Sequence, residues 1–192
     1  RRYALASRLI WLGAAAASAS IDRAVPVLTR LVETLGESAN LAVLSGDRAE
    51  YVAQIPSPHS MRMFTEVGRR AELNCTGVGK AMLSALPDDR IEAIIARTGL
   101  PQKTEHSISE PDALWAEIAA ARARGWVLDE QEQELGMRCI AAPIAGPAGD
   151  VYAVSVSGPL TRITDALIER AVPLLTGAAE EIAGLLDGSR PP

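Results

Sequence analysis

The sequence predicts an α+β fold, and two observations carry this prediction. Segments with strand-like apolar patterns fall into two groups along the chain, and they do not alternate strictly with helices, so a doubly wound parallel sheet is not expected. The chain has 192 residues, of which 48% are hydrophobic and 22% charged, as in an ordinary globular protein. This length accommodates one domain with an appended segment. An antiparallel sheet with helices packed beside it fits both observations.

Helical spacing of apolar residues and terminal signals define the helices. Leu5, Leu9, Leu12 and Ala16 repeat at helical spacing near the N-terminus. This spacing favours an amphipathic helix over a signal peptide, although Ala17-Ser18-Ala19 has the form of a cleavage site. Helices are expected at residues 4–19, 20–36, 76–83, 87–98, 111–125 and 164–186, with a break before residue 20 and Pro26 in the first turns of the second helix.

The strands follow from apolar runs and from alternation of apolar and polar residues. Two apolar runs flank Gly46-Asp47 and predict a β-hairpin. Met61, Met63, Thr65 and Val67 alternate with polar positions, as in a strand with one buried face. Strands are expected at residues 40–45, 50–55, 61–67, 126–129, 138–145 and 151–157.

Composition excludes several classes of function. The net charge is −5 and only 4% of the residues are aromatic, so the chain lacks the basic groove or stacking platform of a nucleic-acid-binding domain. Two cysteines and two histidines are too few for a disulfide framework or for most metal sites. No apolar run reaches the 18 or so residues of a membrane helix. We therefore expect no metal, no cofactor and no membrane contact.

The Gly77-Val78-Gly79-Lys80 segment invites comparison with phosphate-binding loops. It does not match them, because Asn74 replaces the first glycine of a P-loop and Met82 the third glycine of a dinucleotide fingerprint. Two interpretations remain. A glycine-rich turn at a helix start exposes backbone N–H groups that bind a carboxylate. Alternatively, it is a tight turn that lets the helix pack closely.

Polar groups in the C-terminal strands have two interpretations as well. Ser155 and Ser157 point to the same face of one strand, where they either line a polar pocket or satisfy each other and the backbone. Cys139 lies in an apolar strand with no histidine near it in sequence, which favours a small buried hydrophobe over a catalytic nucleophile. The acidic run at residues 129–134 is typical of a solvated loop.

Taken together, four segments resemble the effector-binding domain of IclR-type bacterial transcription regulators. They are residues 73–83 (LNCTGVGKAML), 125–132 (GWVLDEQE), 136–143 (GMRCIAAP) and 153–159 (AVSVSGP). The resemblance covers essentially the whole chain. It implies a GAF-like fold, with a curved antiparallel sheet flanked by helices around a small-ligand cavity and an N-terminal linker helix.

The resemblance also implies roles for individual residues. Backbone N–H groups of Gly77 and Val78 match those that hold the carboxylate of the effector. The hydroxyls of Ser155 and Ser157 match groups that bind the same ligand, and Asp129 and Cys139 match polar groups across the cavity. The apolar wall positions are Met63, Ala71 and Met137.

At the level of the whole protein, the resemblance implies a cytoplasmic regulator that is not an enzyme. Residues 1–19 would be the end of a wing strand (Arg2 to Leu5) and the linker helix, and residues 20–188 the effector-binding domain. A winged helix-turn-helix domain would lie upstream and provide all DNA contact, and a homodimer or homotetramer is expected. A carboxylate effector would shift DNA affinity through its different affinity for two quaternary arrangements. The alternatives are an enzyme using Cys139 and a pure oligomerisation module.

Overall fold

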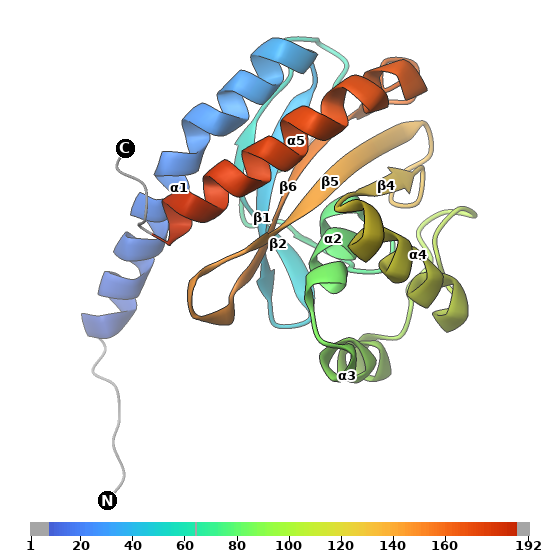
Figure 1. Ribbon diagram of the computed structural model, residues 1–192, viewed down its shortest axis with the longest axis horizontal. Coiled ribbons are helices and arrows are strands. Elements are labelled where there is room, and N and C mark those ends of the chain that lie inside the picture. Colours follow the sequence, from blue (N-terminus) through green and yellow to red (C-terminus); the bar gives the residue numbers. More distant parts are fainter. Residues whose placement is uncertain (1–7, 64, 188–192) are drawn as a thin grey trace, which may run out of the picture.

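A single curved antiparallel sheet organises the chain (Figure 1). The computed structural model describes residues 8–63 and 65–187. Its six strands lie in the order β3-β2-β1-β6-β5-β4. They are β1 (Ser38–Ser45), β2 (Arg48–Ile55), β3 (Arg70–Ala71), β4 (Val127–Glu130), β5 (Met137–Ala145) and β6 (Val151–Pro159). The expected hairpin is confirmed as β1 and β2, and the two strand groups meet where β1 pairs with β6.

The described part of the chain also contains five α-helices. They are α1 (Arg8–Leu35), α2 (Gly77–Ala85), α3 (Asp88–Thr98), α4 (Pro111–Arg124) and α5 (Asp165–Leu186). Figure 1 shows α1 and α5 crossing one face, with α2 and α4 on the other. Local signals explain several helix ends: Thr76 and Thr164 cap α2 and α5 by accepting backbone N–H bonds, and Gly125 ends α4 with φ +81°. The α+β class with helices on both faces is confirmed.

Two clusters of buried side chains correspond to the two faces. The cluster under α1 and α5 contains Leu28, Ile140, Val154, Val156 and Leu175. The cluster under α2 and α4 contains Tyr51, Val78, Ala141, Ala153 and Ile118. Because side chains alternate along a strand, β5 and β6 contribute to both clusters.

The predicted break before residue 20 is wrong, because α1 is continuous from Arg8 to Leu35. Ser20 and Asp22 act as caps only where the preceding chain is not helical, and here an Ala-rich segment continues the helix into them. Pro26 therefore lies in the interior of a long helix, where it removes one backbone hydrogen bond. The predicted wing segment, Arg2 to Leu5, lies outside the described residues.

The strand predicted at residues 61–67 is also wrong. Its alternating residues do not share a buried face, since the side chains of Met61 and Val67 are 72% and 64% exposed. The segment lies between β2 and β3, and only two residues after it, Arg70 and Ala71, pair with β2. Alternation without a partner strand is insufficient to form a strand.

Candidate ligand-binding site

Polar side chains gather on the sheet face that α2 covers. Strand register places Asp129 opposite Cys139, and Cys139 opposite Ser157. One row further along, Ser155 lies opposite Asn40 of β1. Val154 and Val156 alternate with the two serines along β6, and both valines pack under α1 and α5. Because side chains alternate between the faces of a strand, the polar groups face α2. Four of the predicted site residues are thus brought together on three neighbouring strands.

Asn40 connects the two serine hydroxyls. Its Nδ2 donates to Ser155 Oγ at 3.3 Å and to Ser157 Oγ at 3.1 Å. Asn40 Oδ1 is buried and has no hydrogen-bond partner among the residues that the structure describes. The two serines therefore do not satisfy each other; they share one amide donor. An asparagine within the apolar run of β1 is the sequence signal for this residue, which is absent from the predicted site.

The N-terminus of α2 lies directly on β5. A Cβ atom added to Gly77 would lie 2.8 Å from Cys139 Sγ, and one added to Gly79 would lie 2.5 Å from Leu73 Cα. Thr76 Oγ1 accepts the N–H of Gly79 at 3.1 Å. Within the described part of the chain, no acceptor contacts the N–H of Gly77 or Val78. The glycine-rich turn therefore has both expected features. It lets α2 pack closely on β5, and it leaves two backbone N–H groups without an acceptor among the described residues.

Asp129 combines a structural contact with an unusual protonation state. Its Oδ1 accepts the N–H of Glu132 at 2.7 Å and that of Gln133 at 3.4 Å, which fixes the turn after β4. Burial, together with the nearby Glu132 carboxylate, raises the pKa of Asp129 to about 7. The carboxyl group therefore carries a proton for part of the time near neutral pH.

A buried lysine holds this turn against α2. The Lys80 side chain is 2% exposed, forms an ion pair with Glu132 and donates to the backbone carbonyl of Leu128 at 2.6 Å. Glu117 of α4 lies 3.6 Å from the same ammonium group. Glu132 is 4% exposed, so the prediction of a wholly solvated acidic loop is wrong. The cation that offsets its burial comes from a residue 52 positions earlier, which no local pattern indicates.

The chemistry of Cys139 does not fit a nucleophile. Its side chain is buried, and burial together with the charge of Asp129 raises the pKa of the thiol to about 12. Cys75 is likewise buried, and its pKa is raised to about 11. Both thiols are free and protonated at neutral pH. These surroundings disfavour the thiolate that a cysteine nucleophile requires.

The three predicted wall residues differ in placement. Ala71 is buried in the same cluster as Tyr51 and Val78. Met137 is half-buried and shares the face of Cys139, two residues along β5. Met63 is half-buried in the segment between β2 and β3 and belongs to neither buried cluster.

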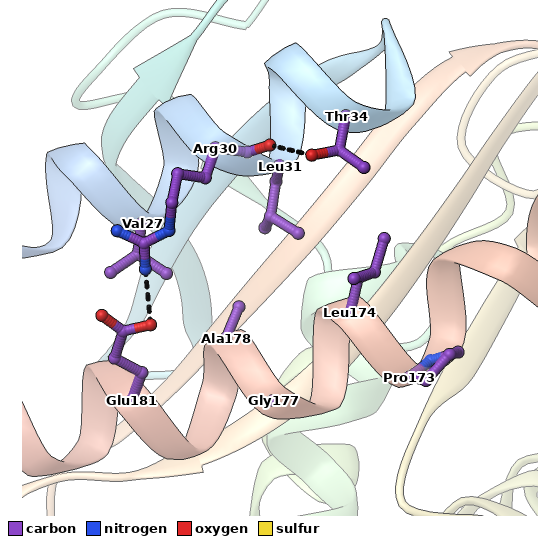
Figure 2. Close-up of a pocket in the computed structure, with 9 residues that line it drawn as sticks. All are labelled: Val27, Arg30, Leu31, Thr34, Pro173, Leu174, Gly177, Ala178 and Glu181. Carbon is purple, nitrogen blue, oxygen red and sulfur yellow. Dashed lines mark hydrogen bonds and ion pairs between the residues drawn. The ribbon is translucent and has the colours of Figure 1, made fainter.

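A groove lies between α1 and α5, which cover the opposite face of the sheet (Figure 1). Its volume is about 330 Å³, and Figure 2 shows its lining. Apart from Thr34, its polar side chains are Arg30 and Glu181, which bind each other at 2.5 Å, so their charges are paired. This groove therefore offers no uncompensated positive charge to an anion. The described residues contain no group of three possible metal ligands and no helix able to span a membrane.

Comparison with known families gives the context of this site. Residues 15–184 match the family described as bacterial transcriptional regulator IclR, C-terminal. The chain belongs to the IclR family. The regulator BhcR of Paracoccus denitrificans is 37% identical over 167 residues, covering 86% of this chain and 60% of the relative. The repressor IclR of Escherichia coli is 34% identical over 168 residues, covering 86% and 61%.

Solved structures of IclR-family regulators share the fold. The Thermotoga maritima IclR structure gives a TM-score of 0.83 at 29% identity, covering 87% of this chain and 68% of that one. A regulator from Rhodococcus sp. RHA1 gives a TM-score of 0.84 at 32% identity, covering 97% and 78%. The chain spans about 60% of the length of the first two curated relatives, and its match is to the C-terminal part of the family.

Proposed function

We propose that this chain senses a small carboxylate, which binds between the N-terminus of α2 and the polar face of the sheet. The observation that carries the proposal is a pair of buried N–H groups, on Gly77 and Val78, without an acceptor among the described residues. Ser155 and Ser157 lie on the sheet face opposite. Hydrogen bonds to a charged carboxylate contribute about 1.5–3 kcal/mol each. Two or three of them contribute about 3–9 kcal/mol before the cost of ordering the ligand, so micromolar affinity, about 8 kcal/mol, also requires apolar contact with the rest of the ligand.

The remaining predicted residues complete the site in this proposal. Asp129 and Cys139 contact the far end of the ligand, where a protonated Asp129 is a hydrogen-bond donor. Met63, Ala71 and Met137 form its apolar wall. No cofactor takes part, and because the Cys139 thiol stays protonated, the bound acid is held without turnover.

We also propose how binding affects transcription. The relative BhcR is named as a helix-turn-helix-type transcriptional regulator, and in our proposal a domain of that type outside these 192 residues contacts DNA and the complete protein acts in the cytoplasm. The boundary expected at residue 20 remains a prediction. The chain assembles as a dimer or tetramer, and α1 transmits the effect of the ligand. A ligand that distinguishes two arrangements changes DNA affinity by a coupling of about 1–3 kcal/mol.

Thermal unfolding with a panel of small acids tests the binding proposal. We expect at least one monocarboxylate to raise the Tm of the wild-type chain, while its amide does not. Ser157→Ala should reduce that acid's affinity, and Gly77→Val should abolish binding, with folding of each variant checked by circular dichroism. Unchanged affinity in both folded variants would contradict the assigned site. Consumption of the acid, lost in Cys139→Ser, would favour an enzyme instead.

A further inference from the structure

Asn40 of β1 binds both serines of β6 in the interior of the fold. Its side chain is 1% exposed, and those of Ser155 and Ser157 are 0% and 2% exposed. Asn40 lies opposite Ser155 in the pairing of β1 with β6, and its amide nitrogen reaches Ser157 as well. The three side chains therefore form one hydrogen-bonded group, which we call the serine group, in a place where bulk water does not replace a lost partner.

The direction of these two hydrogen bonds fixes what the serine hydroxyls can do. An amide NH2 group only donates, so the oxygens of Ser155 and Ser157 both accept from Asn40. A hydroxyl that accepts in this way keeps its own proton for a different acceptor. The Ser155 hydroxyl lies beside the Cys139 thiol, whose pKa burial raises and a hydrogen bond with Ser155 lowers. The Ser157 hydroxyl donates to no acceptor within residues 8–63 and 65–187.

The carbonyl end of the Asn40 amide has no partner. Its Oδ1 is buried, and no donor of the described residues contacts it. The opposite orientation of the amide would place Oδ1 against the serines, where it would accept both hydroxyl protons. The orientation in the structure leaves Oδ1 bare instead, and the penalty for this buried oxygen offsets part of the gain from the two bonds. What this orientation provides is a Ser157 proton that remains available.

The groups around the proposed site are matched in kind. The N–H groups of Gly77 and Val78 only donate, and the hydroxyl proton of Ser157 is a third donor, from the sheet. A carboxylate only accepts, so it needs the serine proton turned toward it. We propose that Asn40 is a positioning residue, which binds the oxygen of Ser157 and so directs its hydroxyl proton to the carboxylate of the ligand. This inference rests on the proposed function and adds to it a residue that does not touch the ligand.

A double-mutant cycle tests whether Asn40 acts through Ser157. Titration calorimetry measures the Kd of acetate, propionate, butyrate and benzoate for the wild type, Asn40→Ala, Ser157→Ala and the double variant. Asn40→Val is a second replacement, because a β-branched side chain suits a strand if the alanine variant does not fold. The control is Ser38→Ala, which removes a buried hydroxyl from the same strand. The partner of that hydroxyl is the N–H of Ser57 at 3.0 Å, outside the serine group.

We expect Asn40→Ala to weaken the tightest of these acids about 3- to 10-fold, because the Ser157 proton is then free to turn away from the carboxylate. In the Ser157→Ala background the same replacement should change the Kd less than about twofold, since the hydroxyl that Asn40 directs is gone. Asn40→Val should behave like Asn40→Ala, and Ser38→Ala should leave the Kd unchanged. A residue that only stabilises the fold would lower the Tm without this dependence on Ser157.

Other outcomes overturn the inference in distinguishable ways. If Asn40→Ala weakens the acid equally in both backgrounds, Asn40 does not act through Ser157, and the carboxylate site stands. No change of the Kd in folded Asn40→Ala or Asn40→Val, or an equal loss of affinity in Ser38→Ala, also overturns the role of Asn40 and leaves the site in place. If none of the four acids binds the folded wild-type chain, the proposed function itself fails, and this inference fails with it.

Discussion

The two faces of the sheet use the same strands for different purposes. Valines and serines alternate along β6. Val154 and Val156 pack under α1 and α5, while Ser155 and Ser157 face α2. The valine face buries apolar area and so stabilises the fold. The serine face buries an amide, two carboxyl groups and an ammonium group, which contribute little net stability. Buried polar groups of this kind are expected at functional sites.

The largest expected effect comes from breaking the buried ion pair on the α2 face. Lys80→Met leaves Glu132 buried with no cation in contact, and should lower the free energy of unfolding by about 3–5 kcal/mol. The control is Arg30→Met, which breaks the exposed Arg30–Glu181 pair and should cost under about 1 kcal/mol. Urea unfolding measures both. Equal losses of unfolding free energy in the two variants would contradict the claim that the α2 face buries its charges and the α1 and α5 face does not.

The next effect compares neighbouring residues of one strand. Val156→Ala should lower the free energy of unfolding by about 2–3 kcal/mol, because it leaves a cavity under α1 and α5. Ser157→Ala should cost about 0.5–1.5 kcal/mol, because it removes one hydrogen bond from Asn40. For acid binding the order should reverse, with Ser157→Ala the more damaging. The comparison fails if Val156→Ala weakens acid binding as much as Ser157→Ala does.

The last comparison concerns pH and the Asp129 carboxyl group. Its pKa is about 7 in the folded chain and near 3.8 ordinarily, so the folded chain keeps a proton that the unfolded chain releases between these values. Stability should therefore fall as pH rises through this window, by at most about 1.4 kcal/mol per pH unit from this group. Asp129→Asn keeps an acceptor for the N–H of Glu132 but cannot ionise.

Urea unfolding between pH 4 and pH 8 measures this difference. The variant should be more stable than the wild type at pH 8, and the difference should shrink toward pH 4. Glu132, whose pKa burial also raises, leaves some residual slope in both proteins. Parallel curves for wild type and variant across the whole range would show that Asp129 ionises as freely when folded as when unfolded.

Local patterns predicted most of the fold because its elements carry their own signals. The hairpin turn at Gly46-Asp47 and the caps at Thr76 and Thr164 correspond to element ends in the structure. Where the outcome depends on partners, prediction failed. The segment 61–67 has the alternation of a strand but no strand beside it, and the cap-like residues near 20 lie inside a continuous helix.

The candidate site shows the same limit. Ser155 and Ser157 share a face by parity alone, which sequence reveals. Asn40 and Lys80 join the site through pairing of distant strands and packing of α2, which no single-strand pattern contains. The family resemblance indicated positions for the carboxylate, but the contacts among the buried polar groups became visible only in three dimensions.

The most direct test of the central claim is a crystal structure of the chain with its most stabilising acid. The account predicts density for the acid on the α2 face, with its carboxylate oxygens within hydrogen-bond distance of the N–H groups of Gly77 and Val78. Ser155 and Ser157 should contact the same ligand from the sheet, and Asp129 and Cys139 should lie at its other end. Density for the acid in the groove between α1 and α5 instead, as drawn in Figure 2, would contradict the account.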